Sequence, residues 1–396
     1  MSVIVRVAAR GEGVSEDGRH AAFAAPGDTL TEAGEVVPGP HHQQPPCRHF
    51  PACGGCQLQH LDDDAYGAFV IDRIASALDA HDLSASIRPP LLSPPRTRRR
   101  ATLHAEGKGG RVLLGFAAEK SHAIVDMHEC HILAPELFAL VAPLRSLLAR
   151  LGLKRRADVQ LTLTDQGADV LIAGFAPDGL AAAEAITVFA ERHGLARLSV
   201  DDGLGPETRW EPRPVTVTLG STPVPFPPGS FLQATREGEA ALVAAVREAV
   251  GSPATTADLF SGLGTFALAL PGKVYAAEGA REAIMSLKAG ANAAQRPVFA
   301  DHRDLYRRPL TTVELDRFDA IVLAPPRAGA RDQAAALAAS RATIIAYVSC
   351  NPSSFARDAL ALTHGGWRLD WIQPVGQFRW STHVELAARF SRSVSS

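Results

Sequence analysis

From about Gln233 to the end of the chain, segments typical of strands alternate with segments typical of helices. Short apolar runs are followed by longer stretches in which apolar residues recur at helical spacing. This alternation is typical of a parallel sheet covered by helices, with ligands at the carboxyl ends of the strands. We therefore expect an α/β fold with a Rossmann-like sheet over residues 235–396. The expected strands are Thr255–Phe260, Lys273–Glu278, Val298–Ala300, Phe318–Leu323, Thr343–Ser349, Trp367–Val375 and Val384–Phe390.

The first 234 residues follow a different pattern. Residues 1–45 hold short apolar stretches between Gly, Pro and acidic turns, which predicts a small β module ending in a Pro/His/Gln-rich linker. Residues 46–234 contain helical spacing over 65–78 and 135–151, and otherwise favour strands. We expect this range to be a central α+β domain.

Composition excludes several classes of protein. With 46% hydrophobic residues and a net charge of −2 among 396 residues, the chain is not wholly disordered. No apolar run reaches the roughly 18 residues of a membrane span, and no signal-peptide pattern opens the sequence. The near-neutral charge means that any nucleic acid would meet local basic patches, such as Arg96–Arg100. We expect a cytoplasmic protein.

A glycine-containing loop follows the first expected strand of the C-terminal region. The segment Asp258-Leu-Phe-Ser-Gly262-Leu-Gly264 would let the backbone come close to a nucleotide-like ligand. Glu278 ends the next strand, where a carboxylate can accept both ribose hydroxyls. S-adenosylmethionine and a dinucleotide both fit this pattern. Ala267 stands where the dinucleotide fingerprint requires its third glycine, which favours S-adenosylmethionine.

An isolated thiol and a late carboxylate lie at the same expected edge. Cys350 ends an apolar strand and precedes Asn351-Pro352, which forces a turn. A thiol acts as a nucleophile when its surroundings favour the thiolate. Glu385 begins the last strand, where it could serve as a general base if it reaches the proton it removes.

The other four cysteines indicate a metal centre. Cys47, Cys53 and Cys56 lie within ten residues, and Cys130 is 74 positions further on. An odd cysteine count without an export signal argues against a disulfide framework. Spacing alone leaves zinc and an iron–sulfur cluster equally open.

Together these blocks resemble the bacterial S-adenosylmethionine-dependent RNA uracil-5-methyltransferases, and within them the iron–sulfur-containing 23S rRNA subgroup. The resemblance runs from about Cys47 to the end of the chain. It is carried by the four cysteines, Asp258–Gly264, Val348–Pro352 and His383–Glu385, with Phe231–Gln233 and Pro325–Gly329 in support.

The resemblance implies a class I methyltransferase domain over 235–396, a central RNA-binding domain with a [4Fe–4S] cluster over 46–234, and a truncated TRAM-like β module over 1–45. It implies transfer of a methyl group from S-adenosylmethionine to C5 of a uridine, in 23S rRNA or alternatively in tRNA, by a monomer. Cys350 would be the nucleophile and Glu385 the base. The implied cofactor-binding positions are Gln233, Phe260, Thr265, Glu278, Asp304 and Ala324, and the implied cluster ligands are Cys47, Cys53, Cys56 and Cys130.

The chief departure from the family is Ala324, which stands where the family has the Asp of Asp-Pro-Pro-Arg. Loss of one polar contact costs about 1–3 kcal/mol, which is roughly a tenfold to hundredfold loss of affinity or rate. We therefore expect weakened activity, with a catalytically idle RNA-binding protein as the alternative.

Overall fold

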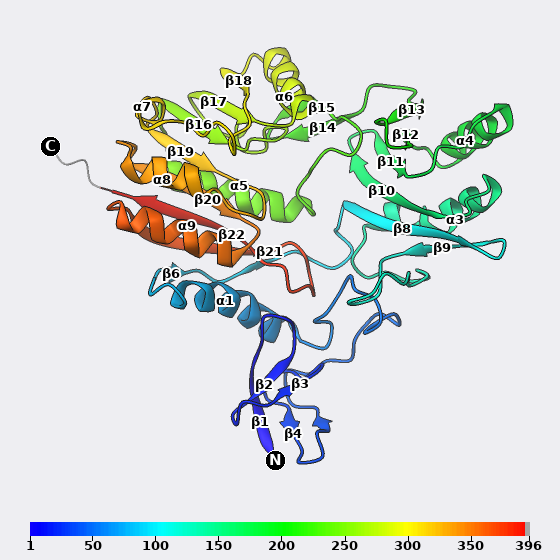
Figure 1. Ribbon diagram of the computed structural model, residues 1–396, viewed down its shortest axis with the longest axis horizontal. Coiled ribbons are helices and arrows are strands. Elements are labelled where there is room, and N and C mark those ends of the chain that lie inside the picture. The colour runs from blue at the N-terminus through cyan, green and yellow to red at the C-terminus, as the bar shows by residue number, and fades with distance from the viewer. Residues whose placement is uncertain (393–396) are drawn as a thin grey trace.

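The computed structural model describes residues 1–392 as three connected parts (Figure 1). The amino-terminal strands form one end, the sheet of the central domain lies to one side, and the carboxyl-terminal sheet with its helices forms the largest part. Within residues 1–392, no helix combines the length and apolar composition needed to cross a membrane.

The amino-terminal module is a five-stranded sheet of very short strands. Its order is β3-β2-β1-β4-β5 with antiparallel pairing throughout. Its core is small, and consists of Ile4, Ala21, Ala24 and Leu30. The strands are β1 (Ser2–Val7), β2 (Gly13–Ser15), β3 (His20–Ala21), β4 (Thr29–Leu30) and β5 (Val36–Val37).

The central domain is a six-stranded sheet with helices packed against it. The strand order is β13-β12-β11-β10-β8-β9, antiparallel except for the β11–β12 pair. Its own apolar core is separate from those of the other parts. The strands are β8 (Arg100–Lys108), β9 (Arg111–Gly115), β10 (Arg156–Thr164), β11 (Gly167–Ala173), β12 (Arg197–Asp201) and β13 (Glu207–Trp210). The helices are α2 (Pro135–Phe138), α3 (Val141–Arg150) and α4 (Leu180–Arg192), so the helix expected over 135–151 is two helices.

The carboxyl-terminal part is the expected parallel sheet. Its order is β18-β17-β16-β19-β20-β22-β21-β6, and β7 also pairs with β21. Strands β16 to β20 are parallel, whereas β22 is antiparallel to both of its neighbours. The strands are β16 (Thr255–Leu259), β17 (Lys273–Glu278), β18 (Val298–His302), β19 (Ala320–Leu323), β20 (Ile344–Ser349), β21 (Arg368–Gly376) and β22 (Glu385–Ser391).

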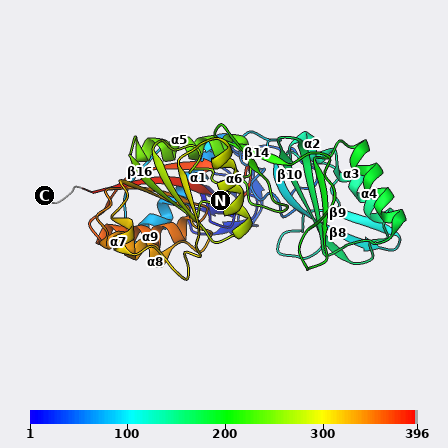
Figure 2. The ribbon, with the colours of Figure 1, turned by 90° about the horizontal axis from the view of Figure 1, so that it is seen from above.

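Helices cover both faces of this sheet. In Figure 2, α5 (Arg236–Val250) lies above the strands, and α8 (Arg331–Ala339) and α9 (Pro352–His364) lie below them. Two apolar cores accordingly form, one on each face. On the sheet face that α5 covers, α6 (Arg281–Ala293) and the β14–β15 hairpin (Thr216–Leu219 and Thr222–Pro225) also pack. On the opposite face, α7 (Thr312–Leu315) packs in the same core as α9.

One stretch that we assigned to the central domain belongs to the carboxyl-terminal sheet instead. Helix α1 (Asp63–Asp79) packs against α9 and β21, and β6 (Ser86–Ile87) and β7 (Leu91–Leu92) pair parallel with β21. The reason is the apolar stripe of α1, whose residues Phe69, Ile74 and Leu78 are buried in the core of that face. The sheet is therefore built from two separate segments of the chain.

Candidate active site

The glycine loop after β16 has the tight backbone that the sequence predicts. Phe260, Gly262 and Gly264 all have positive φ angles of 65°, 55° and 95°. At the φ of 95° another residue at position 264 would be strained, and its Cβ atom would lie 2.3 Å from Leu287 Cδ1 of α6. The loop consequently packs directly on α6 and leaves its backbone at the carboxyl edge of the sheet.

Asp258 supports this loop from inside the sheet. Its side chain is fully buried, and Oδ2 accepts a hydrogen bond from the Ala267 amide at 2.8 Å. Among the described residues its Oδ1 has no partner. Burial, with a smaller contribution from the negative charge of Glu278, raises the pKa of Asp258 to about 7. Asp258 therefore holds the loop rather than facing a ligand.

Glu278 lies at the end of β17 and faces the same loop. Its Oε2 accepts the Gly262 amide at 2.9 Å, and its Oε1 accepts the Ala280 amide at 2.7 Å. The carboxylate is thus fixed by backbone donors, and each oxygen retains a lone pair for a further hydroxyl group. Thr265, in the same loop, is half-buried.

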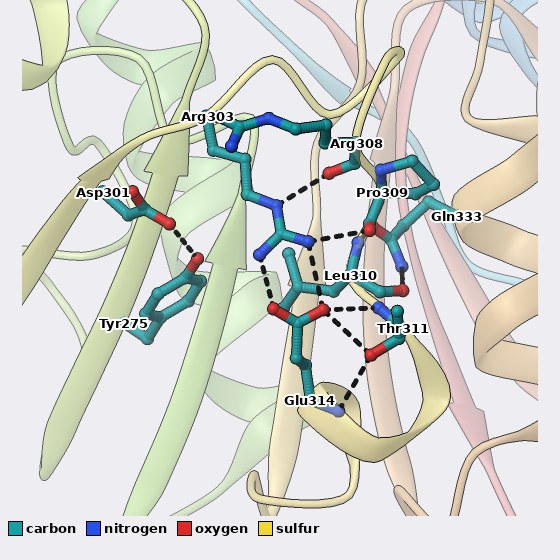
Figure 3. Close-up of polar contacts among 9 residues, drawn as sticks. All are labelled: Tyr275, Asp301, Arg303, Arg308, Pro309, Leu310, Thr311, Glu314 and Gln333. Carbon is teal, nitrogen blue, oxygen red and sulfur yellow. Dashed lines mark hydrogen bonds and ion pairs between the residues drawn. The ribbon is translucent and has the colours of Figure 1, made fainter.

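Asp304 follows β18, at the next strand end, on a segment that a partly buried ion pair anchors. Arg303 donates to both oxygens of Glu314, at 2.6 and 3.0 Å, and to the carbonyls of Arg308 and Pro309 (Figure 3). Gln333 completes this support through two hydrogen bonds to the backbone of Leu310. The anchor holds in place the turn in which Asp304 accepts the Tyr306 amide at 3.0 Å.

Tyr306 extends this turn across the glycine loop. Its ring lies 5.4 Å from that of Phe260, and its hydroxyl donates to the Gly329 carbonyl at 3.1 Å. The sequence contained no signal that singled out Tyr306.

Cys350 and Glu385 meet at this edge from opposite directions. In the β20–β22 pair, Ser349 is opposite Leu386, so the next residues outward are Cys350 and Glu385. Burial raises the pKa of the Cys350 thiol, the neighbouring Glu385 raises it further, and Arg327 acts in the opposite direction. Burial also raises the pKa of Glu385, to about 7. A thiol and a carboxyl group are therefore adjacent in a partly desolvated site.

Gln233 reaches the same place from the segment before α5. It is buried, and its Oε1 accepts a hydrogen bond from Gln377 Nε2 at 2.7 Å. Gln377 also donates to Glu385 Oε2 and lies in the loop between β21 and β22. Sequence reasoning missed Gln377, because a glutamine in a loop carries no distinguishing pattern.

Ala324 lies directly after β19, which stands in the strand order between β16, with its glycine loop, and β20, which precedes Cys350. Its amide donates to the Leu259 carbonyl at 3.1 Å, and its methyl group packs against the core below α5. All positions that the sequence singled out in this region thus lie at the carboxyl edge of the parallel strands or immediately beside it.

The remaining four cysteines line one cavity between the cysteine segment and the central domain. All four are free thiols, and burial raises the pKa of Cys53 and Cys130, and that of Cys56 to about 12. Among the described residues, no group of three or more His, Cys, Asp or Glu side chains is arranged to hold a metal ion. The metal centre therefore stays a prediction. The other walls are mostly apolar and include Phe50, Phe116, Val125, Met127 and Ile132.

Two glycines allow the chain to wrap around this cavity. A Cβ atom on Gly54 would lie 2.8 Å from the Ala117 carbonyl, and one on Gly55 would lie 3.1 Å from the Phe116 ring and 3.5 Å from Cys53 Sγ. The same segment touches the loop before β22, because the amides of Gln57 and Leu58 both donate to the Trp380 carbonyl at 2.8 and 2.9 Å.

The arginine run is largely internal, which corrects the expectation that it contacts phosphate. Arg99 is buried and pairs with Glu239 at 2.6 Å, while its Nε donates to the Gln233 carbonyl. Arg98 lines the cysteine cavity and lies over the Phe378 ring, and Arg100 lies over the Phe231 ring. Arg96 is the exposed member of the run. The density of positive charge in the sequence predicted a surface patch, but most of these guanidinium groups contact residues of other parts of the protein.

Comparisons with known proteins agree on one family. Residues 229–392 match the family described as tRNA (Uracil-5-)-methyltransferase. An uncharacterized RNA methyltransferase of Zymomonas mobilis is 49% identical over 396 residues, which cover 99% of this chain and all of the relative. A 23S rRNA (uracil(1939)-C(5))-methyltransferase of Pectobacterium atrosepticum is 30% identical, over 90% of this chain and 81% of the relative.

Among solved structures, the chain is similar in fold to the Pyrococcus abyssi tRNA (uracil-54, C5)-methyltransferase, which was crystallised with S-adenosyl-L-homocysteine. The TM-score is 0.74 at 22% identity, and the match covers 98% of this chain and all of that one. The likeness confirms the mixed α/β methyltransferase fold.

Proposed function

This chain belongs to the RNA uracil-5-methyltransferase family. On that premise we propose that it methylates C5 of a uridine in 23S rRNA, with Cys350 as the nucleophile and Glu385 as the base. The observation that carries this proposal is that Cys350 and Glu385 lie next to each other just beyond the last β20–β22 pair, Ser349 and Leu386. The glycine loop, Glu278 and Asp304 lie at the same edge.

Cys350 supplies the nucleophile. Its thiolate adds to C6 of the uracil ring, which turns the C4–C5 bond into an enolate and makes C5 nucleophilic. Burial and the neighbouring Glu385 raise the pKa of this half-buried thiol, and the positive charge of Arg327 acts in the opposite direction. S-adenosylmethionine, when bound, supplies the methyl group as an electrophile that C5 attacks. The target base must leave its stack to reach this edge.

Glu385 completes the reaction by accepting the C5 proton. Electrons of that C–H bond then restore the C5–C6 double bond and expel the Cys350 thiolate. A buried carboxyl group with a pKa near 7 is suited to this step, because a base is most effective when its pKa lies close to the operating pH.

The cofactor side is assigned to the loop and strand ends beside this pair. Glu278 would accept the ribose hydroxyls, since both of its oxygens are held by backbone amides and face the loop. Phe260, Thr265, Asp304 and Gln233 would form the remaining wall. Ala324 offers only a methyl group there, which supports a weakened rather than an abolished activity.

The four cavity cysteines, Cys47, Cys53, Cys56 and Cys130, would hold a [4Fe–4S] cluster. This proposal is supported by the four free thiols that line one mostly apolar cavity, and by Gly54 and Gly55, which let the chain pass close to Ala117 and Phe116. The cluster would supply a cross-link between the cysteine segment and the central domain. Zinc is the alternative, and anaerobic iron and zinc analysis separates the two.

The 23S rRNA substrate is favoured by the Pectobacterium relative, and tRNA is the second candidate because the family description names it. Either substrate implies work in the cytoplasm. Arg96, the exposed member of the arginine run, would be available for contact with RNA phosphate.

The test uses RNA that contains 5-fluorouridine, whose C5 fluorine cannot leave as a proton does. The wild-type chain should form an SDS-resistant adduct with an rRNA fragment, and Cys350→Ser should form none. A parallel set of tRNA transcripts separates the two substrates. Absence of an adduct with either RNA would reject this function and leave an idle RNA-binding protein.

A further inference from the structure

Gln377 connects the predicted base to the predicted cofactor wall. It lies in the loop after β21 and is 2% exposed, so its amide must find partners inside the protein. Its Nε2 group donates one hydrogen bond to Glu385 Oε2 and another to Gln233 Oε1, the latter at 2.7 Å. Its Oε1 accepts the Ala234 amide at 2.8 Å. Both protons of the amide nitrogen are therefore used.

The surroundings allow this side chain little freedom. A Cβ atom on Gly238, in the first turn of α5, would lie 2.6 Å from Gln377 Cβ and 3.0 Å from its Oε1. Glycine at 238 is thus what lets α5 approach the amide closely. The neighbouring Thr235 caps the same helix through the Gly238 amide at 2.9 Å. Helix, linker and loop consequently hold the amide in one orientation.

This orientation decides which atoms remain for chemistry. On Glu385, Oε2 is occupied by the donor from Gln377, so Oε1 is the oxygen left to take the C5 proton. On Gln233, Oε1 is occupied, so its amide hydrogens are left to face a ligand. A donor to the carboxylate also favours its ionised form, which is the form that accepts a proton.

We propose that Gln377 is a positioning residue that fixes the free carboxylate oxygen of Glu385 and the amide of Gln233 relative to each other, so that proton removal follows methyl transfer without delay. This inference rests on the proposed function. It places Gln377 in the late half of the reaction, after Cys350 has bonded to C6.

The experiment compares Gln377→Met with Gln373→Met. Met has nearly the size of Gln but no hydrogen-bond donor. Gln373 is the control because it is likewise a buried glutamine, but it lies within β21 and donates to the Pro89 and Pro374 carbonyls. Two signals are followed with RNA carrying tritium at uridine C5: release of tritium, and methyl label in the SDS-resistant protein–RNA adduct.

Gln377→Met removes three hydrogen bonds, and the one to the charged Glu385 acts on proton removal. Tritium release should therefore be about tenfold to hundredfold slower. The methylated adduct should accumulate. Adduct formation with 5-fluorouridine RNA should stay within about threefold of wild type, because none of the three lost hydrogen bonds involves Cys350. Gln373→Met should behave as wild type. Unchanged tritium release, or an equal fall in both signals, would overturn the inference.

Gln377→Glu provides a second reading if the Met variant does not fold. It keeps size and polarity but places a second carboxyl group against Glu385, which raises the pKa of the base. The methylated adduct should again accumulate, and most strongly at low pH. The inference would be overturned if this variant released tritium and accumulated methylated adduct in the same proportion as the wild type. If the wild-type chain formed no adduct with 5-fluorouridine RNA, the proposed function itself would be rejected.

Discussion

The five cysteines occupy two regions that differ in what surrounds the sulfur. In the cavity, three of the four thiols have a pKa raised first by burial and then by one another, and the walls are mostly apolar. At the sheet edge, Cys350 is a single thiol, half-buried, with Glu385 and Arg327 beside it. A grouped set of buried thiols needs a bound cation to ionise, whereas a lone thiol needs only a local change of charge.

That contrast gives each region a different expected sensitivity. Substitution at the sheet edge should change the rate of the reaction and leave the fold intact. Substitution in the cavity should change metal content and stability before it changes the rate.

The largest effect is expected for Cys350→Ser. A hydroxyl group cannot add to C6 as a thiolate does, so methyl transfer should fall by at least about 10³-fold. Incorporation of labelled methyl groups into an rRNA fragment measures this. The thermal midpoint should stay within about 2 °C of wild type. Retained turnover would show that Cys350 is not the nucleophile.

Glu385→Gln is expected to have the next largest effect. Loss of a general base slows its step by about 10²–10⁴-fold. In the wild type the base must be ionised, and its pKa is about 7, so turnover should fall as the pH drops below 7. A profile of turnover against pH from 5 to 9 tests this. A flat profile over that range would contradict the role of Glu385.

Ala324→Asp should raise activity. The carboxylate would restore the acceptor that the family carries at the end of this strand, with a gain of about 1–3 kcal/mol, or roughly tenfold to hundredfold in kcat/KM. Steady-state kinetics with S-adenosylmethionine and RNA measure it, and Ala320→Ser, on the same strand, is the control. No gain would mean that position 324 does not contribute to the pocket.

In the cavity, Cys56→Ser should lower turnover by less than about tenfold. Its main effects should be loss of iron, measured on anaerobically purified protein, and a lower thermal midpoint. The cysteine segment also holds the loop before β22 through the Trp380 carbonyl, which explains why a modest loss of rate is expected. A loss of rate as large as that of Cys350→Ser would remove the distinction between the two regions.

The smallest effect is a change in how stability depends on pH. Asp258 keeps its proton up to a pH of about 7 in the folded chain, whereas an unfolded aspartate loses it near 4. Between these values the folded state binds more protons, so the stability of the wild type falls as the pH rises. Asp258→Asn removes this contribution, and Glu385 retains a similar one. Thermal midpoints at pH 5 and pH 8 should therefore differ less in the variant.

The sequence predicted what depends on local pattern. The rhythm of strand and helix located the parallel sheet, and the position of Glu278 after the glycine loop followed from it. The pairing of β20 with β22 could not be predicted, because β22 inserts between β20 and the earlier strand β21. The meeting of Cys350 with Glu385 depends on that long-range choice, so the resemblance rather than the residues supplied it.

Other features depend on partners that no local pattern identifies. Gln377 is significant only because Gln233 and Glu385 fold against it. In the sequence Arg99 looks like one member of an exposed run of arginines, whereas in the folded chain it is paired with Glu239 and with the Gln233 carbonyl. Short strands such as β6 and β7 carry too few residues to show which sheet they join.

The pairing of β6 and β7 with β21 makes the central domain an insertion within the methyltransferase domain. A fragment that begins at residue 235 would leave the edge of β21 unpaired and the apolar surface of α9 open, and such an edge invites aggregation. The autonomous unit is therefore a discontinuous one. A fragment made to isolate this unit should keep the segments on both sides of the inserted domain.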